Sequence, residues 1–361
     1  MRLSTRRRVG LFLRVLGLGV VTSAQLGTAV GAVFRHWPLF GALSGTINGV
    51  ALMAAIAGAE IFLPQTRLGY LLERAPLLVT FAAKWLAYSA VILLVVGGRL
   101  GPRVATAVLL SGGPGQALDQ AKGVPEILMV PVTFLLMLPL ILLLLLVRLL
   151  GERTLRNIMF GRYHRSRNEH RFFLFVDIAG STPLAERIGP AAVHRFLGEV
   201  FRLASDPIDD HFGEVYQYVG DEIVITWTVG EGRARARPLA CFFAIEQALE
   251  RAAPDFEREF GTVPHLRAAL HAGPVITGEV GGSRRAIVYH GDVMNTTSRI
   301  EQATRDLERK YLVSSDALER LDGADAYTLE DLGLQRLRGR AATVRVYAVE
   351  AKSVDGARRN E

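Results

Sequence analysis

One apolar run in the second half of the chain constrains the fold more than any other feature. Residues 172–178 are mostly aromatic or β-branched, with a single acid, Asp177, near the end. This is the composition of a buried strand. Gly180, Ser181 and Thr182 follow, and a small-residue turn into a helix offers backbone N–H groups to anionic oxygens. We therefore expect a strand that ends on a carboxylate, at a place suited to a metal ion facing a phosphate.

A second acid is expected at the tip of a hairpin. Two β-rich runs, 214–219 and 223–228, are joined at Gly220 and Asp221, which is a hairpin signal. Carboxylates on neighbouring strand ends are suited to hold two hard divalent cations. Taken one at a time, Asp177 and Asp221 are more typical of structural or helix-capping aspartates.

The first 150 residues contain four long apolar segments. They span about residues 11–34, 39–63, 76–98 and 127–150, and each is near the ~20 residues that a helix needs to cross a bilayer. An uncleaved first helix is favoured over a signal peptide because further spans follow. Arginines lie before the first segment and after the fourth, which by the positive-inside rule places both ends in the cytoplasm. We expect a four-helix transmembrane domain at residues 1–150, in a bacterial inner membrane.

Two ionisable residues, Glu60 and Lys84, lie inside these expected spans. Such charges usually face the protein interior, so the two residues form a pair or, alternatively, Lys84 snorkels and Glu60 is interfacial. The sequence does not identify a signal that this half senses. Residues 151–170 form a basic linker, which is either a tether on anionic lipid or an element that transmits a signal to the second half.

Charge and cysteine content exclude some classes of function. The net charge of +7 lies largely beside the apolar segments, and no basic stripe with interleaved aromatic residues is present, so nucleic acid is not an expected partner. The single cysteine, Cys241, rules out an intrachain disulfide. Its apolar neighbours are typical of a core residue rather than a nucleophile.

The second half alternates strands and helices with frequent hairpins, which predicts an α+β fold with a mostly antiparallel sheet. The expected helices cover residues 183–204, 238–252 and 293–303, and further strands are expected at 266–271, 275–280 and 343–349.

Four motifs in this half carry a resemblance to a known family. They are FVDIAGST at 175–182, VGDE at 219–222, HAGPV at 271–275 and GDVMNTTSR at 291–299. In this order they resemble the catalytic domain of class III nucleotidyl cyclases over residues 171–350, followed by a polar tail at 351–361. The resemblance implies a ferredoxin-like domain that works as a head-to-tail homodimer with active sites built from both chains.

The resemblance also implies roles for particular residues. Asp177, Asp221 and the backbone carbonyl of Ile178 would hold two Mg²⁺ or Mn²⁺ ions. One ion would lower the pKa of the ribose 3′-hydroxyl and the other would bind the triphosphate. Asn295 and Arg299, four residues apart on one helix face, would orient the ribose and stabilise charge on the α-phosphate.

The substrate is predicted less directly. Arg338, with Arg340 close behind, resembles a basic turn that holds the terminal phosphates. Gln217 and Val288 stand where the family commonly has a Lys and an Asp or Thr that select the purine. Because the Gln217 amide bonds a base edge and Val288 does not, adenine recognition is expected to depend on Gln217 and on backbone groups near Tyr289.

These observations predict a membrane-bound adenylate cyclase that converts ATP to cyclic AMP and pyrophosphate, with ATP, a second copy of the chain and the lipid bilayer as partners. A guanylate cyclase and a catalytically silent, cyclase-like membrane receptor are the alternatives. A diguanylate cyclase is not favoured, because residues 178–182 fit the mononucleotide cyclases better.

Overall fold

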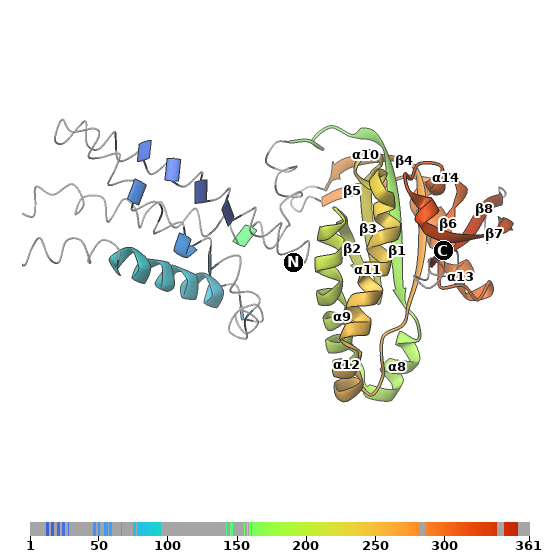
Figure 1. Ribbon diagram of the computed structural model, residues 1–361, viewed down its shortest axis with the longest axis horizontal. Coiled ribbons are helices and arrows are strands. Elements are labelled where there is room, and N and C mark those ends of the chain that lie inside the picture. Colours follow the sequence, from blue (N-terminus) through green and yellow to red (C-terminus); the bar gives the residue numbers. More distant parts are fainter. Residues whose placement is uncertain are drawn as a thin grey trace, which may run out of the picture. The chain divides into compact units, whose positions relative to one another are not determined.

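The computed structural model describes residues 161–281, 286–337 and 343–352, together with helix 78–94 and scattered positions before residue 161. The chain divides into two compact units, Met1–Leu155 and Arg156–Glu361 (Figure 1).

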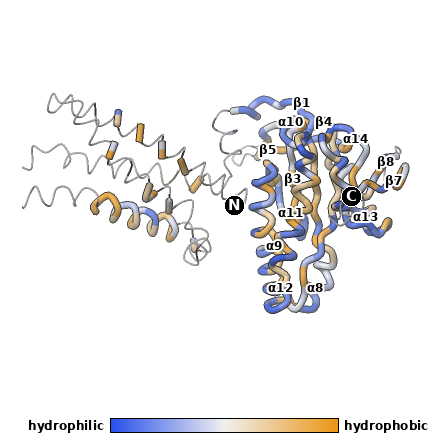
Figure 2. The backbone as a smooth tube through the Cα atoms, in the orientation of Figure 1, coloured by the Kyte–Doolittle hydropathy of each residue, from blue (hydrophilic) through white to orange (hydrophobic). Residues whose placement is uncertain are grey.

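The described part of the first unit is dominated by helix 78–94, which lies within the third expected apolar segment. Its last four residues, 91–94, are all apolar (Figure 2), and Tyr88 and Ile92 pack with Ile56 and Leu145 in a small buried cluster. Most of the four expected spans, and Glu60, lie outside the described residues. In the part of the chain that the structure describes, no helix is both long and apolar enough to cross a bilayer, so the predicted transmembrane bundle has no support in the described structure.

The second unit is built on one eight-stranded sheet with the order β2-β3-β1-β4-β6-β8-β7, and β5 pairs with β4. Its pairs are antiparallel except β4 with β6, which is parallel, so the mostly antiparallel α+β prediction is confirmed for this unit. The strands are β1 (Arg167–Ile178), β2 (Glu214–Val219), β3 (Glu222–Thr228), β4 (Leu266–Val280), β5 (Ala286–His290), β6 (Tyr311–Ser314), β7 (Tyr327–Arg336) and β8 (Thr343–Ala351).

The helices follow the strands in the order that the sequence indicates. They are α8 (Ser181–Ile188), α9 (Pro190–Asp210), α10 (Val229–Gly232), α11 (Arg237–Arg251), α12 (Ala253–Phe260), α13 (Asp292–Asp306) and α14 (Ser315–Leu318), with short 3₁₀ turns at Ala234–Ala236 and Ala324–Ala326.

Strand β1 lies in the middle of the sheet and is covered on both faces. Phe172, Leu174 and Val176 pack in the large core with residues of α9 and α11, whereas Phe173 and Phe175 belong to a second cluster on the other face. Because side chains alternate along a strand, Asp177 belongs to the same face as Phe173 and Phe175. Burial on both sides explains why this strand is a nearly continuous apolar run.

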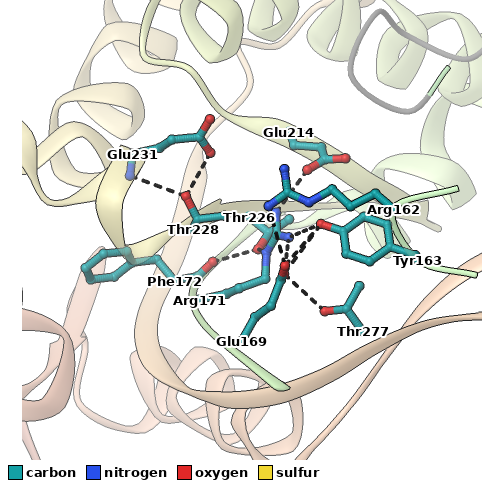
Figure 3. Close-up of polar contacts among 10 residues, drawn as sticks. All are labelled: Arg162, Tyr163, Glu169, Arg171, Phe172, Glu214, Thr226, Thr228, Glu231 and Thr277. Atoms are coloured by element: carbon teal, nitrogen blue, oxygen red, sulfur yellow. Dashed lines mark hydrogen bonds and ion pairs between the residues drawn. The ribbon is translucent and has the colours of Figure 1, made fainter. Parts of the chain in front are cut away.

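The first half of β1 carries a buried charge cluster (Figure 3). The Arg171 side chain is nearly inaccessible to solvent and lies over the Tyr289 ring, 4.8 Å from its centre. Its guanidinium donates to Thr226 Oγ1 at 3.1 Å, Glu169 Oε2 at 3.0 Å, Glu214 Oε2 at 2.9 Å and Tyr163 Oη at 3.4 Å. The cluster therefore ties Tyr163, in the segment before β1, to the sheet. β1 begins at Arg167, within the expected linker, rather than at Phe172, because residues 167–171 pair with residues 273–277 of β4.

Two other boundaries differ from the sequence-based expectation. The single helix predicted over 183–204 is two helices, because Gly189 adopts φ 81° and Pro190 starts α9. The two strands predicted at 266–271 and 275–280 form one long strand, β4, which continues through Pro274. β1 pairs with β4 along its whole length, so neighbouring hydrogen bonds hold β4 together where Pro274 lacks an N–H.

Candidate active site

The fold brings the two predicted acids to one edge of the sheet. Asp177 is opposite Glu222 in the β1–β3 register, and Asp221 is the adjacent residue in the β2–β3 turn, which Gly220 closes with φ 62°. Burial of Asp177 raises the pKa of its carboxyl, the charge of Asp221 raises it further, and Arg305 opposes both. The two carboxylates thus lie close enough to repel each other, as two acids sharing a cation site do.

The turn after β1 holds Asp221 in place. Ser181, the first residue of α8, donates its hydroxyl to Asp221 Oδ2. Gly180 before it adopts φ 76°, a left-handed conformation that glycine adopts without steric cost. Ile178, the other predicted metal-binding position, is the last residue of β1; its side chain is buried, and the following Ala179 N–H donates to His265 O at 2.8 Å.

Three further charged residues share this edge and were not predicted: Glu222, Glu301 and Arg305. Burial, followed by the charges of Glu301, Asp177 and Asp221, raises the pKa of Glu222 to about 7. Burial and Asp177 likewise raise the pKa of Glu301. Two signals could have found them: Glu222 follows Asp221 directly, and Glu301 and Arg305 are four residues apart on the helix of the Asn–Arg motif.

The arrangement suits Mg²⁺ or Mn²⁺ bound together with a phosphate ligand. Mg²⁺ is commonly bound by one or two carboxylates plus substrate phosphates rather than by a complete protein cage. Asp177 and Asp221 supply two carboxylates, and their mutual repulsion is relieved by a cation. Among the described residues, no three His, Cys, Asp or Glu side chains are grouped to hold a metal ion by themselves.

Asn295 and Arg299 lie on α13, the helix that also carries Glu301 and Arg305. Asn295 is exposed and Arg299 is half-buried, and Arg299 donates to Gln302 Oε1 at 3.0 Å. At about 100° per residue, Arg299 is about 120–160° around the helix from Arg305 and Glu301. Arg299 thus lies on a different side of α13 from these two residues, and its hydrogen bond to Gln302 lies within α13. Arg305, by contrast, contacts Asp177.

The residues predicted to contact the purine occupy different strands. Gln217 is exposed on β2, next to an irregularity in the β2–β3 register. Val288 is half-buried on β5, opposite Gly278 of β4. The Tyr289 ring is buried against Phe173 and Tyr216. The roles of Gln217, Val288 and the Tyr289 backbone in binding a base stay predictions.

Arg338 and Arg340, the predicted phosphate ligands, lie outside the described residues. Leu337, which directly precedes Arg338, is buried just after the end of β7. Their role stays a prediction.

Relatives of known function or structure match about half to two thirds of the chain. The relatives include adenylate cyclase 2 of Rhizobium meliloti (strain 1021), 39% identical over 218 residues, which are 60% of this chain and 60% of the relative. An adenylate cyclase of Mycobacterium tuberculosis (strain H37Rv) is 27% identical over 197 residues, 55% of this chain and 42% of the relative. The chain thus covers less than two thirds of these relatives.

A solved bacterial light-regulated adenylyl cyclase shares the fold with a TM-score of 0.53 at 20% identity, covering 63% of this chain and 67% of that one. The family model described as the adenylate and guanylate cyclase catalytic domain matches residues 165–351, more than half of the 361 residues. Together with the motifs that hold Asp177 and Asp221, this match shows that the chain belongs to the class III adenylate and guanylate cyclase family.

Proposed function

We propose that the protein is a membrane-bound adenylate cyclase that converts ATP to 3′,5′-cyclic AMP and pyrophosphate. The observation that carries the proposal is the meeting of Asp177 and Asp221 at one edge of the sheet, beside the turn into α8. ATP is favoured over GTP because the curated relatives described above are named adenylate cyclases.

Asp177 and Asp221 would hold the Mg²⁺ or Mn²⁺ ions, with the Ile178 carbonyl as a further ligand. When bound, the ions supply electrophilic activation of the ribose hydroxyl and neutralise charge on the triphosphate. The chain's own contribution is to fix the carboxylates: β1 places Asp177 by its pairing with β3 and β4, and Ser181 orients Asp221.

Two copies of the chain would build each active site. Arg299 lies about 120–160° around α13 from Arg305 and Glu301, which supports its use, together with Asn295, by a second copy. There, Asn295 would orient the ribose and the Arg299 fork would bind the α-phosphate as charge develops. Arg338 or Arg340 would bind the terminal phosphates, and Gln217 the adenine edge, with backbone groups near Tyr289.

The apolar first half would anchor the enzyme in the inner membrane, with the catalytic unit in the cytoplasm. This part of the proposal is supported by the four apolar segments and the arginines that flank them. Protease protection of the N-terminal half in membrane vesicles, with the catalytic unit digested on the cytoplasmic side, would support it; extraction of the chain by carbonate would contradict it.

The activity is tested by offering ATP and GTP separately to the purified full-length protein with Mn²⁺. We expect cyclic AMP from ATP, and we expect Asp177→Asn and Asp221→Asn each to abolish turnover. The matched control is Asp255→Asn, an exposed acid on α12 that is paired with Arg258, which should retain activity. Full turnover in both site variants would refute the assignment of the metal ligands, and cyclic GMP from GTP alone would identify a guanylate cyclase.

The shared site has a separate test. Chains carrying Asp177→Ala and chains carrying Arg299→Ala are each expected to be inactive, and co-expression should restore part of the activity because one site of the mixed dimer is intact. If mixed dimers are isolated and stay inactive, the two-chain site is wrong.

A further inference from the structure

The contact between Arg305 and Asp177 has an unusual balance of exposure. Arg305 Nη2 lies 3.1 Å from Asp177 Oδ2, and the side chain of Arg305 is 58% exposed whereas that of Asp177 is 8% exposed. A solvent-facing guanidinium therefore covers a nearly buried carboxylate. Arg305 thus places a positive charge on the Asp177 carboxylate, which we propose as a ligand of the divalent cation.

Glu301, one helical turn before Arg305, lacks a hydrogen bond where it needs one. Its side chain is 7% exposed, and its Oε1 atom is buried without a hydrogen-bond partner. Arg305 Nη2 lies 3.8 Å from this oxygen, which is too far for a hydrogen bond, and Arg267 adds a smaller electrostatic attraction. A buried carboxylate oxygen without a donor is costly, so Glu301 is an acceptor positioned to receive a donor from Arg305.

We propose that Arg305 is a positioning residue that takes the place of a cation on Asp177 and moves to Glu301 when a divalent cation binds. The inference rests on the proposed function, because it takes Asp177 to be a metal ligand. A guanidinium and a divalent cation repel each other when they share one carboxylate oxygen. The path for Arg305 is short, because closing the 3.8 Å gap to a hydrogen bond of ~2.8 Å needs a shift of only about 1 Å.

This arrangement predicts opposite effects for two substitutions. Arg305→Gln removes the competing charge, so Mn²⁺ should bind about two- to fivefold more tightly, because an ion pair with an exposed partner is usually worth a factor of about five at most. Glu301→Gln removes the negative charge that attracts the Arg305 guanidinium away from Asp177, so Mn²⁺ should bind more weakly. A purely structural role for Arg305 predicts the reverse, because a displaced Asp177 would lose affinity for the metal.

A double substitution separates an indirect role of Glu301 from direct metal binding. If Glu301 acts by accepting Arg305, Glu301→Gln should have little effect once Arg305→Gln is present. If Glu301 binds the metal itself, its loss should weaken Mn²⁺ binding equally in both backgrounds.

The experiment is a Mn²⁺ titration of the full-length protein without nucleotide, in which electron paramagnetic resonance measures free Mn²⁺. Asp177→Asn defines the site-specific component, and Arg258→Gln, which removes an exposed guanidinium paired with Asp255, controls for the change in net charge. Tighter binding in Arg305→Gln, with no change in Arg258→Gln and no added effect of Glu301→Gln, supports the proposal.

Three results would overturn it: unchanged or weaker Mn²⁺ binding in Arg305→Gln, an equal tightening in Arg258→Gln, or a Glu301→Gln effect that persists without Arg305. Failure of the proposed function looks different. In that case Asp177→Asn leaves Mn²⁺ binding unchanged, and the metal site itself, rather than the role of Arg305, is refuted.

Discussion

Neutralising Glu222 should remove a pH-dependent loss of stability from the catalytic unit. Glu222 lies beside Asp221, and burial together with three neighbouring carboxylates raises its pKa from 4.5 to about 7. The folded state therefore holds this proton more tightly than the unfolded state does. The stabilisation is complete below pH 4.5 and is lost as the pH rises to about 7.

The size of this effect follows from the change in proton affinity. Each pKa unit is worth about 1.4 kcal/mol, so the full difference corresponds to roughly 3 kcal/mol. Glu222 is only partly buried, and water screens part of the repulsion, so we expect about 1–2 kcal/mol. Glu222→Gln should thus be more stable than the natural chain at pH 8 and nearly equal to it at pH 5, in the presence of EDTA.

Cys241 provides a reporter of unfolding within the full-length chain. It is the sole cysteine, it is completely buried on α11, and burial raises the pKa of its thiol, so alkylation requires the catalytic unit to open. The ratio of alkylation rates between variant and natural chain cancels the effect of pH on the reagent. An effect of 1–2 kcal/mol slows alkylation of Glu222→Gln about 5- to 30-fold at pH 8.

The control is Glu186→Gln, which neutralises an exposed carboxylate on α8 and should give the same rate ratio at both pH values. If the ratio for Glu222→Gln is also the same at pH 5 and pH 8, the repulsion among the carboxylates is not present and the reasoning is refuted.

Two further predictions use the same alkylation assay. Arg171→Met should destabilise the catalytic unit by about 3–5 kcal/mol, because Glu169 and Glu214, which are largely buried, lose the guanidinium that both contact. A loss of stability below about 1 kcal/mol would contradict the stabilising role of the cluster. Gly213→Ala should cost about 1–3 kcal/mol, because its Cβ would lie within 2.9 Å of three side-chain atoms. Gly198→Ala, on helix α9 with open space around it, should instead be neutral or stabilising by up to about 1 kcal/mol, and equal effects at both glycines would contradict the packing argument.

Local sequence patterns predict the strands of the catalytic unit better than the boundaries between its elements. The run 172–178 and the hairpin around Asp221 were found because apolar periodicity and Gly-containing turns are local signals. The break at Gly189 was missed because an amphipathic pattern continues on both sides of it. The sequence does not indicate the true start of β1, because residues 167–171 include charged side chains. The partners that bury Arg171, such as Glu214 and Tyr289, are distant in the sequence.

The same distinction holds for the site. Asp177 and Asp221 were identified from motifs, but Glu222, Glu301 and Arg305 were not. Glu301 becomes part of the site only because α13 packs beside β1, and helical spacing alone does not separate a buried acid from one on a solvated face. Arg305 likewise gains significance only through its contact with a residue on another element.

The position of Arg171 links the segment before β1 mechanically to Asp177 at the far end of the strand. Arg171 and Asp177 share one strand, about 20 Å apart at ~3.3 Å per residue, and β1 is hydrogen-bonded to β3 and β4 on its two sides. Sliding β1 by one residue would turn Asp177 toward the wrong face of the sheet. We therefore expect β1 to move as one rigid element: a displacement of Tyr163 should move the whole sheet, and Asp177 with it, while the geometry around Asp177 stays unchanged.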